Sequence, residues 1–131
     1  MSSISRTYRI LIASIVMMIT NETVSAQSNA QMVRMAKLVI DAHQLASYNT
    51  FLKEEIETST RLEPGVLALY AVAEKKDPTH ITILEIYANV EAYKSHLQTT
   101  YFLKYKNGTK DMVVGLELVE VDPLIPGMKI K

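Results

Sequence analysis

The sequence predicts one α+β domain at residues 32–122, with the ferredoxin-like element order β-α-β-β-α-β. Four apolar runs with strand character are separated by two segments in which apolar residues recur at helical spacing. A charged turn at residues 74–78 joins the second and third apolar runs and indicates a hairpin. This order is the split βαβ arrangement, in which one face of the sheet packs against the two helices.

The first half of the domain is predicted as strand, helix and strand. The first strand covers residues 32–40 and ends at Asp41, which together with Gln44 matches a helix capping box. The helical pattern that follows is carried by Leu45, Tyr48, Phe51, Leu52 and Ile56. The Pro64-Gly65 turn ends this helix, and the second strand covers residues 66–73.

The second half continues with a strand at residues 79–88, for which Asn89 supplies the N-cap of the next helical region. That region is expected to break near Thr99-Thr100, where a second N-cap is available, and to continue toward Thr109. Alternation at residues 115–121 predicts the last strand. Residues 123–131 form an irregular tail.

Both faces of the predicted strands carry apolar residues, although the helices cover only one face. We expect the second face, with Ile81, Ile83 and Val39, to be left open in a monomer. An open apolar face indicates a partner, so the sequence predicts a homodimer with the two sheets face to face. This arrangement is a dimeric α/β barrel, with a pocket between each sheet and its own helices.

Composition excludes several classes of function. The net charge is zero and no basic patch stands out, which disfavours nucleic acid as a partner. The chain has no cysteine, so disulfides and thiolate zinc sites are impossible. The three histidines are His43, His80 and His96, and their scattered spacing disfavours a dedicated metal site.

The N-terminal segment has the features of a signal peptide. Arg6 and Arg9 form a positive region before the apolar run at residues 10–19, and Val24-Ser25-Ala26 is a plausible cleavage site. The apolar run is too short to span a bilayer, which needs roughly 20 residues. We therefore expect a signal peptide at residues 1–26, a polar linker at 27–31, and a mature protein exported to the bacterial periplasm or medium without a membrane span.

Two polar residues in the third strand and second helical region are candidates for chemistry. Glu85 falls on the same strand face as Ile81, Ile83 and Tyr87, where an unpaired carboxylate is costly. His96 follows on the next helix, so a carboxylate and an imidazole bracket a potential pocket. The acidic run that contains Glu55 is interpreted instead as a solvated helix face. It consists of Glu54, Glu55 and Glu57.

Several segments together resemble the antibiotic biosynthesis monooxygenase family, and in particular its quinol monooxygenase branch. They are the Glu63-Pro64-Gly65 turn, the strand Thr82-Ile83-Leu84-Glu85-Ile86-Tyr87, and the helix Glu91-Ala92-Tyr93-x-x-His96. The resemblance covers roughly residues 33–122. It implies a dimeric ferredoxin-like barrel and the oxidation of small quinols, phenols or similar aromatic compounds by O2 without a cofactor.

The resemblance carries Glu85 and His96 over as catalytic candidates and implies that Tyr87 and Tyr93 line the same cavity. In such chemistry a base forms a substrate anion, and a dry pocket holds that anion against O2. This sequence has Thr100-Tyr101 where related proteins read Pro-His, so Tyr101 is the candidate to replace the second histidine. The chain lacks tryptophan, which disfavours the branch that degrades heme.

Two alternatives remain open at this point. The first is a periplasmic small-molecule binding module without turnover, which the Thr100-Tyr101 departure favours. The second is an isomerase of a small phosphorylated sugar-derived compound, which requires a phosphate clamp. The candidates for such a clamp are Arg34, Lys37 and Arg61, and among them Arg61 is taken as a substrate-binding candidate.

Overall fold

The computed structural model describes residues 30–125, and the predicted signal peptide lies outside them. The elements are β1 (Met32–Ile40), the short 3₁₀ helix η1 (Ala42–Gln44), α1 (Leu45–Leu62), β2 (Val66–Ala73), β3 (His80–Tyr87), α2 (Val90–His96), α3 (Thr100–Thr109) and β4 (Val113–Val121). The ferredoxin-like order is confirmed. Within residues 30–125 no helix is long and apolar enough to cross a bilayer.

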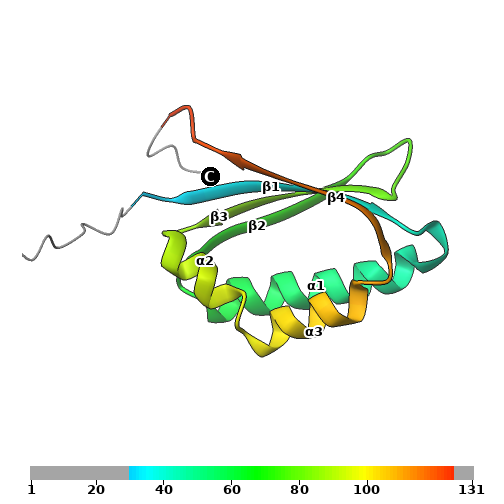
Figure 1. Ribbon diagram of the computed structural model, residues 1–131, viewed down its shortest axis with the longest axis horizontal. Helices are drawn as coiled ribbons and strands as arrows, with labels where there is room; N and C mark the ends of the chain where they lie inside the picture. Colours follow the sequence, from blue (N-terminus) through cyan, green and yellow to red (C-terminus); the bar gives the residue numbers. More distant parts are fainter. Residues whose placement is uncertain (1–29, 126–131) are drawn as a thin grey trace, which may run out of the picture.

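The four strands form one antiparallel sheet in the order β2-β3-β1-β4. Figure 1 shows α1 and α3 side by side beneath one face of this sheet, with α2 near the end where β3 leads into it. The main core lies between the sheet and the helices. It contains Ala36, Leu38, Ile40, Tyr48, Leu52, Ile81 and Ile83.

Side-chain capping sets the helix boundaries, largely as the sequence predicts. The Asn89 side chain accepts a hydrogen bond from the backbone N–H of Ala92, and Thr99 accepts one from Phe102. The first cap begins α2, and the second begins α3 and separates it from α2. Asp41 instead caps the η1 turn by accepting from the N–H of His43, and α1 begins one turn later than a simple capping box implies.

The structure corrects the prediction about which apolar residues are left on the open sheet face. Ile81 and Ile83 are buried in the core on the helix side, because they share a strand face with Glu85 and Tyr87. The uncovered face carries the alternate residues of each strand. Tyr70 and Val72 of β2 are exposed on it.

Candidate active site

A cavity of about 430 Å³ opens between the helices and the face of the sheet that they cover. Its wall is mainly apolar, with Ala36, Leu38, Leu52, Leu69, Ile83, Leu116 and Leu118 among the lining residues. Glu85, His96, Tyr87 and Tyr93 all line it as well. The structure thus brings both predicted catalytic residues and two of the predicted binding residues to one cavity.

Glu85 reaches the cavity because strand alternation in β3 directs it to the helix-covered face. The hydroxyl of Tyr87 donates a hydrogen bond to Glu85 Oε2 at 3.1 Å. Burial raises the pKa of the Glu85 carboxyl above its ordinary value, while the Tyr87 hydrogen bond and the charges of Arg34 and His96 oppose this rise. A carboxylate with a raised pKa is a stronger base than an exposed one.

His96 ends α2 with its imidazole held between two carboxyl groups. Its Nδ1 lies 2.8 Å from Oε2 of Glu63, and its Nε2 lies 3.4 Å from Oε1 of Glu55. The side chains of His96 and Glu55 are only 3% and 6% exposed. Ser59 Oγ donates a further hydrogen bond of 2.6 Å to Glu55 Oε1. We refer to Glu55, His96 and Glu63 as the carboxyl–imidazole cluster.

The position of Glu55 corrects the interpretation of residues 54–57 as a solvated face. Glu54 and Glu57 are exposed, whereas Glu55 is buried. A sequence signal for this exists, because Tyr48, Leu52, Glu55 and Ser59 follow one another at spacings of three or four residues. That spacing forms a single buried stripe along α1.

The carboxyl–imidazole cluster can move a proton. Since two hydrogen-bond acceptors do not face each other favourably, the contact between Glu55 and His96 needs a proton on one partner. Either the imidazole is charged and donates to both carboxylates, or it is neutral and the carboxyl that faces its bare nitrogen is protonated, as Glu55 is when the ring proton is on Nδ1. Burial raises the pKa of Glu55, so the state with a protonated Glu55 is more favourable than it would be for an exposed glutamate. The cluster therefore has more than one proton arrangement in one geometry.

Aromatic rings complete the wall near His96. Tyr87 packs edge to face on Tyr93 with ring centroids 5.3 Å apart, and the Phe102 ring lies 4.9 Å from the His96 ring. Tyr105 also lines the cavity, and its hydroxyl is 2.7 Å from that of Tyr48. Such a wall suits a planar aromatic ligand.

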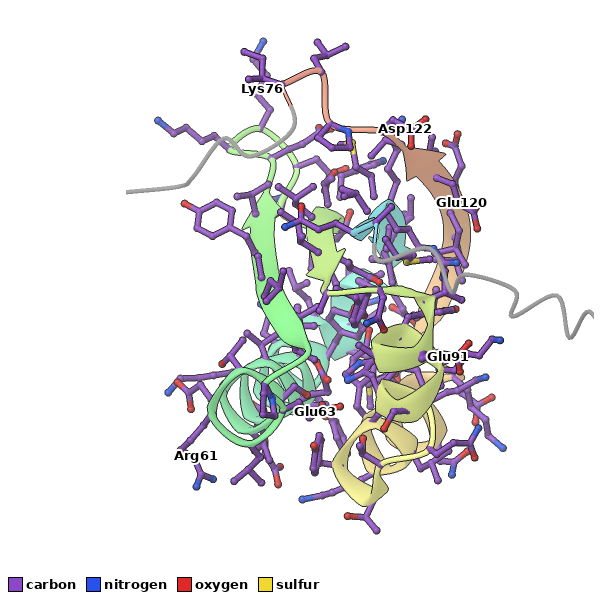
Figure 2. All side chains as sticks on the ribbon, turned by 90° about the vertical axis from the view of Figure 1, so that its left-hand side faces the viewer. Arg61, Glu63, Lys76, Glu91, Glu120 and Asp122 are labelled. Carbon is purple, nitrogen blue, oxygen red and sulfur yellow. The ribbon has the colours of Figure 1, made fainter. Side chains whose placement is uncertain are left out.

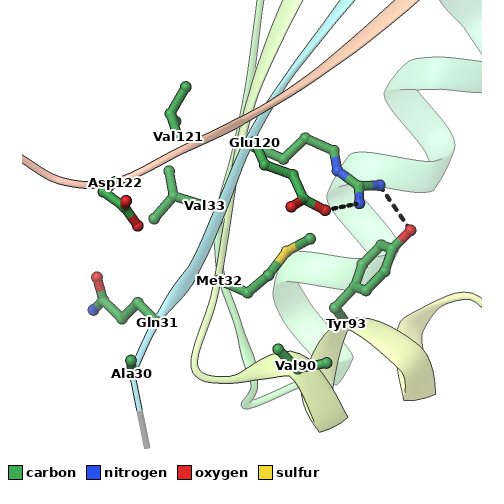
Figure 3. A pocket seen from close by; sticks show the side chains of 10 residues that line it. Ala30, Gln31, Met32, Val33, Val90, Tyr93, Glu120, Val121 and Asp122 are labelled. Carbon is green, nitrogen blue, oxygen red and sulfur yellow. Dashed lines mark hydrogen bonds and ion pairs between the residues drawn. The ribbon is translucent and has the colours of Figure 1, made fainter. Parts of the chain in front are cut away.

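A second hollow of about 350 Å³ lies next to the cavity, between the start of β1, the end of β4 and α2 (Figure 3). Arg34 and Tyr93 line both spaces. The Arg34 guanidinium donates to the Tyr93 hydroxyl at 2.7 Å and lies 3.4 Å from Glu120 Oε1 (Figure 3).

Two other predicted binding residues do not line either space. Arg61 is exposed, and Figure 2 shows its side chain pointing away from the molecule. Tyr101, the expected replacement for a family histidine, is partly buried but does not border the cavity. Burial and the nearby Glu63 carboxylate raise the pKa of Tyr101. Tyr101 therefore lies beside Glu63 of the carboxyl–imidazole cluster.

Within residues 30–125, no group of three histidine, aspartate or glutamate side chains is arranged to hold a metal ion. The carboxyl–imidazole cluster does not do so, because the two ring nitrogens of His96 face different carboxylates on opposite sides of the ring. Its members are therefore arranged as a chain of hydrogen-bonding groups.

The sequence profile of the antibiotic biosynthesis monooxygenase family matches residues 32–108. A solved structure from Bacteroides thetaiotaomicron VPI-5482, named a "putative antibiotic biosynthesis monooxygenase", is 62% identical to this chain. The match covers 77% of this chain and 96% of that one, with a TM-score of 0.76. This chain belongs to the antibiotic biosynthesis monooxygenase family.

More distant members show how widely the fold is shared. A solved structure from Nitrosomonas europaea, also named a "putative antibiotic biosynthesis monooxygenase", is 20% identical, with a TM-score of 0.68 over 73% of this chain and 92% of that one. Another from Caulobacter crescentus CB15 is also 20% identical, with a TM-score of 0.65 over 72% and 92%. At this identity the likeness shows the fold alone. No curated protein matches the chain.

Proposed function

We propose that this member of the antibiotic biosynthesis monooxygenase family is a cofactor-independent monooxygenase that oxidises a small quinol or phenol with O2. The observation that carries the proposal is a half-buried carboxyl with a raised pKa, Glu85, on the wall of an apolar and aromatic cavity. The cavity volume of about 430 Å³ is within the range of small-molecule sites.

In the proposed reaction Glu85 takes the hydroxyl proton of the bound ring. The resulting phenolate is electron-rich and donates electrons to O2. One oxygen atom is added to a ring carbon that loses its hydrogen, and the other leaves as water. A hydroquinone and O2 thus become a hydroxyquinone and water, with the ring supplying all four electrons. The apolar wall keeps bulk water from protonating the anion.

The carboxyl–imidazole cluster is proposed to return protons to the reacting oxygen. His96 is close enough to Glu85 for its charge to affect that carboxyl. Glu63, at the end of α1, links the imidazole to the less buried side of the cluster. Figure 2 shows Glu63 at this helix end, between α1 and α2. A proton released by O2 reduction or needed for water formation can move along this chain of groups.

Oxygen consumption by the full chain, with a panel of small quinols and polyphenols, tests this function. The proposal expects uptake that needs both protein and substrate, and transfer of one atom from ¹⁸O2 into the product. Metal-stripped protein should retain the activity. Ligand-induced thermal stabilisation without oxygen uptake would instead indicate a binding module without turnover.

The geometry gives less support to the phosphorylated-sugar isomerase. The three cations that were candidates for a phosphate clamp do not converge. Arg34 lines the cavity, Lys37 lies on the opposite sheet face by strand alternation, and Arg61 is exposed beyond the end of the cavity. A dianionic phosphate usually needs several such donors.

We also propose a homodimer with the uncovered sheet faces together. The exposed Tyr70 ring is the largest apolar group exposed on that face, and Val72 lies two residues farther along β2. Light scattering should give twice the chain mass, and Tyr70→Glu should shift the mass toward the monomer because it introduces a charge into an apolar interface. A monomeric wild type would contradict this proposal.

Export is proposed from the N-terminal pattern of Arg6, Arg9 and the apolar run at residues 10–19. Expression in a bacterial host should release a product that begins at Gln27. A product that keeps its full N-terminus and stays in the cytoplasm would contradict export.

A further inference from the structure

Arg34 occupies the centre of a row of side chains that crosses the sheet on the cavity side. The strand register pairs Arg34 with Glu85 of β3 on one side and with Glu120 of β4 on the other. Glu85 is in turn paired with Leu69 of β2. Directly paired residues in an antiparallel sheet have Cβ atoms about 4.5–5.5 Å apart. The proposed base and a guanidinium are therefore immediate neighbours.

Arg34 and Glu85 each make their hydrogen bonds to other residues. Arg34 donates to the Tyr93 hydroxyl and approaches Glu120, a side chain that is 78% exposed, at the long distance of 3.4 Å. Glu85 accepts from Tyr87. Within residues 30–125, the buried Arg34 Nε has no hydrogen-bond partner. A guanidinium carries five N–H donors, so Arg34 has donors left for a ligand.

The Arg34 side chain is also held in place. It is only 11% exposed, and its guanidinium carbon lies 4.5 Å from the centre of the Tyr93 ring in a cation–π contact. A buried donor that lacks a partner is costly, so an oxygen atom that enters the cavity beside it is bound favourably. Preorganised donors of this kind stabilise charge that develops during a reaction.

The residues around Arg34 favour one kind of ligand oxygen. Among residues 30–125, Arg34 is the one arginine that lines the cavity, and the two other lining cations, Lys106 and Lys110, are exposed residues at the end of α3. The surrounding wall is apolar and aromatic. One guanidinium in such a wall matches a single negative charge on an aromatic ring better than a phosphate.

We infer that Arg34 binds the phenolate oxygen that forms when Glu85 takes the proton of the bound phenol. This inference rests on the proposed function and adds a residue and a substrate group to it. In the step, the O–H bond of the phenol breaks, the proton forms a new O–H bond on Glu85, and the electron pair stays on the ring oxygen beside Arg34. No electrons are exchanged at this stage.

The probe that tests this is 4-nitrophenol, whose anion absorbs visible light and whose neutral form does not. Titration of the full chain should show that bound 4-nitrophenol ionises at a lower pH than the free compound. Arg34→Gln should weaken binding of the anion by about 10- to 100-fold, the value of a hydrogen bond to a charged group. 4-Nitroanisole, which cannot ionise, should bind both proteins equally.

Lys53→Gln is the matched control, since it also removes one positive charge but from an exposed side chain on α1. It should leave the ionisation of the probe unchanged. Equal ionisation in Arg34→Gln and the wild type would overturn the inference. If Arg34→Gln does not fold, the wild type alone decides, because a bound probe that ionises no more readily than the free one also overturns it.

The two proposals fail in different ways. If 4-nitrophenol bound to the wild type shows no shift in its ionisation, Arg34 does not bind the phenolate, even if oxygen uptake is observed. A clear shift that depends on Arg34, without oxygen uptake from any quinol, would keep the phenolate site and remove the monooxygenase proposal.

Discussion

Glu85→Gln should lower oxygen-dependent turnover by roughly 100-fold or more, which is the usual contribution of a positioned general base. Glutamine keeps the size of the side chain and can still accept the hydrogen bond from Tyr87. It cannot take a proton. The rate of oxygen uptake at saturating substrate therefore measures the loss of the base rather than a loss of the cavity.

The pH dependence of wild-type turnover should also reflect the ionisation of Glu85. The base must be ionised, and burial raises the pKa of Glu85 above the ordinary value of 4.5. Activity should therefore rise with pH, with a midpoint above 4.5. A profile that is flat across the acidic range would indicate that another group is the base.

The stability of Glu85→Gln should change in the opposite direction to its activity. Because the folded protein binds a proton at Glu85 more readily than the unfolded chain does, the contribution of Glu85 to stability is highest below the unfolded pKa and falls as pH rises through the raised folded pKa. The glutamine variant lacks this loss. It should unfold at a higher temperature than the wild type at neutral pH, with little difference in acid.

Glu57→Gln is the matched control, because Glu57 is exposed on α1 and forms an ion pair with the exposed Lys53. Its turnover should stay near that of the wild type. A Glu85→Gln variant that keeps more than about a third of wild-type activity would remove Glu85 from the mechanism.

His96→Ala should lower the free energy of unfolding at neutral pH by about 3–5 kcal/mol, the cost of removing one partner from a buried charged contact. The variant leaves the Glu55 and Glu63 carboxyls without the imidazole that lies between them. The buried Glu55 carboxyl then loses the favourable charge of His96 and keeps the repulsion of Glu63. Urea unfolding followed by circular dichroism measures this change.

The loss of stability in His96→Ala should shrink as the pH falls. Protonation of Glu55 removes its repulsion with Glu63, and burial raises the pKa of Glu55, so this relief begins at a higher pH than for an exposed glutamate. His43→Ala is the control, since His43 is exposed and should change stability by no more than about 0.5 kcal/mol. A similar loss in both variants, or a loss independent of pH, would contradict the carboxyl–imidazole cluster.

Local patterns in the sequence were sufficient to predict the element order and the strand face that carries Glu85. Strand alternation placed Glu85 with Ile81, Ile83 and Tyr87, and the structure confirms that they share a face. The caps at Asn89 and Thr99 were also local signals, because a cap depends on residues only two or three positions away. These features depend on short stretches of chain.

Tertiary structure decided what the local pattern left open. Periodicity groups Ile81 with Ile83 but does not say that the helices cover their face. It likewise places Glu55 on one stripe of α1 with Tyr48 but does not say that this stripe is buried. The placement of Arg34 beside Glu85 follows from the β1–β3 register, which joins positions 51 residues apart in the sequence. Cross-strand neighbours are set by pairing and packing of the whole sheet, so only the folded chain brings the base, the guanidinium and the imidazole to one cavity.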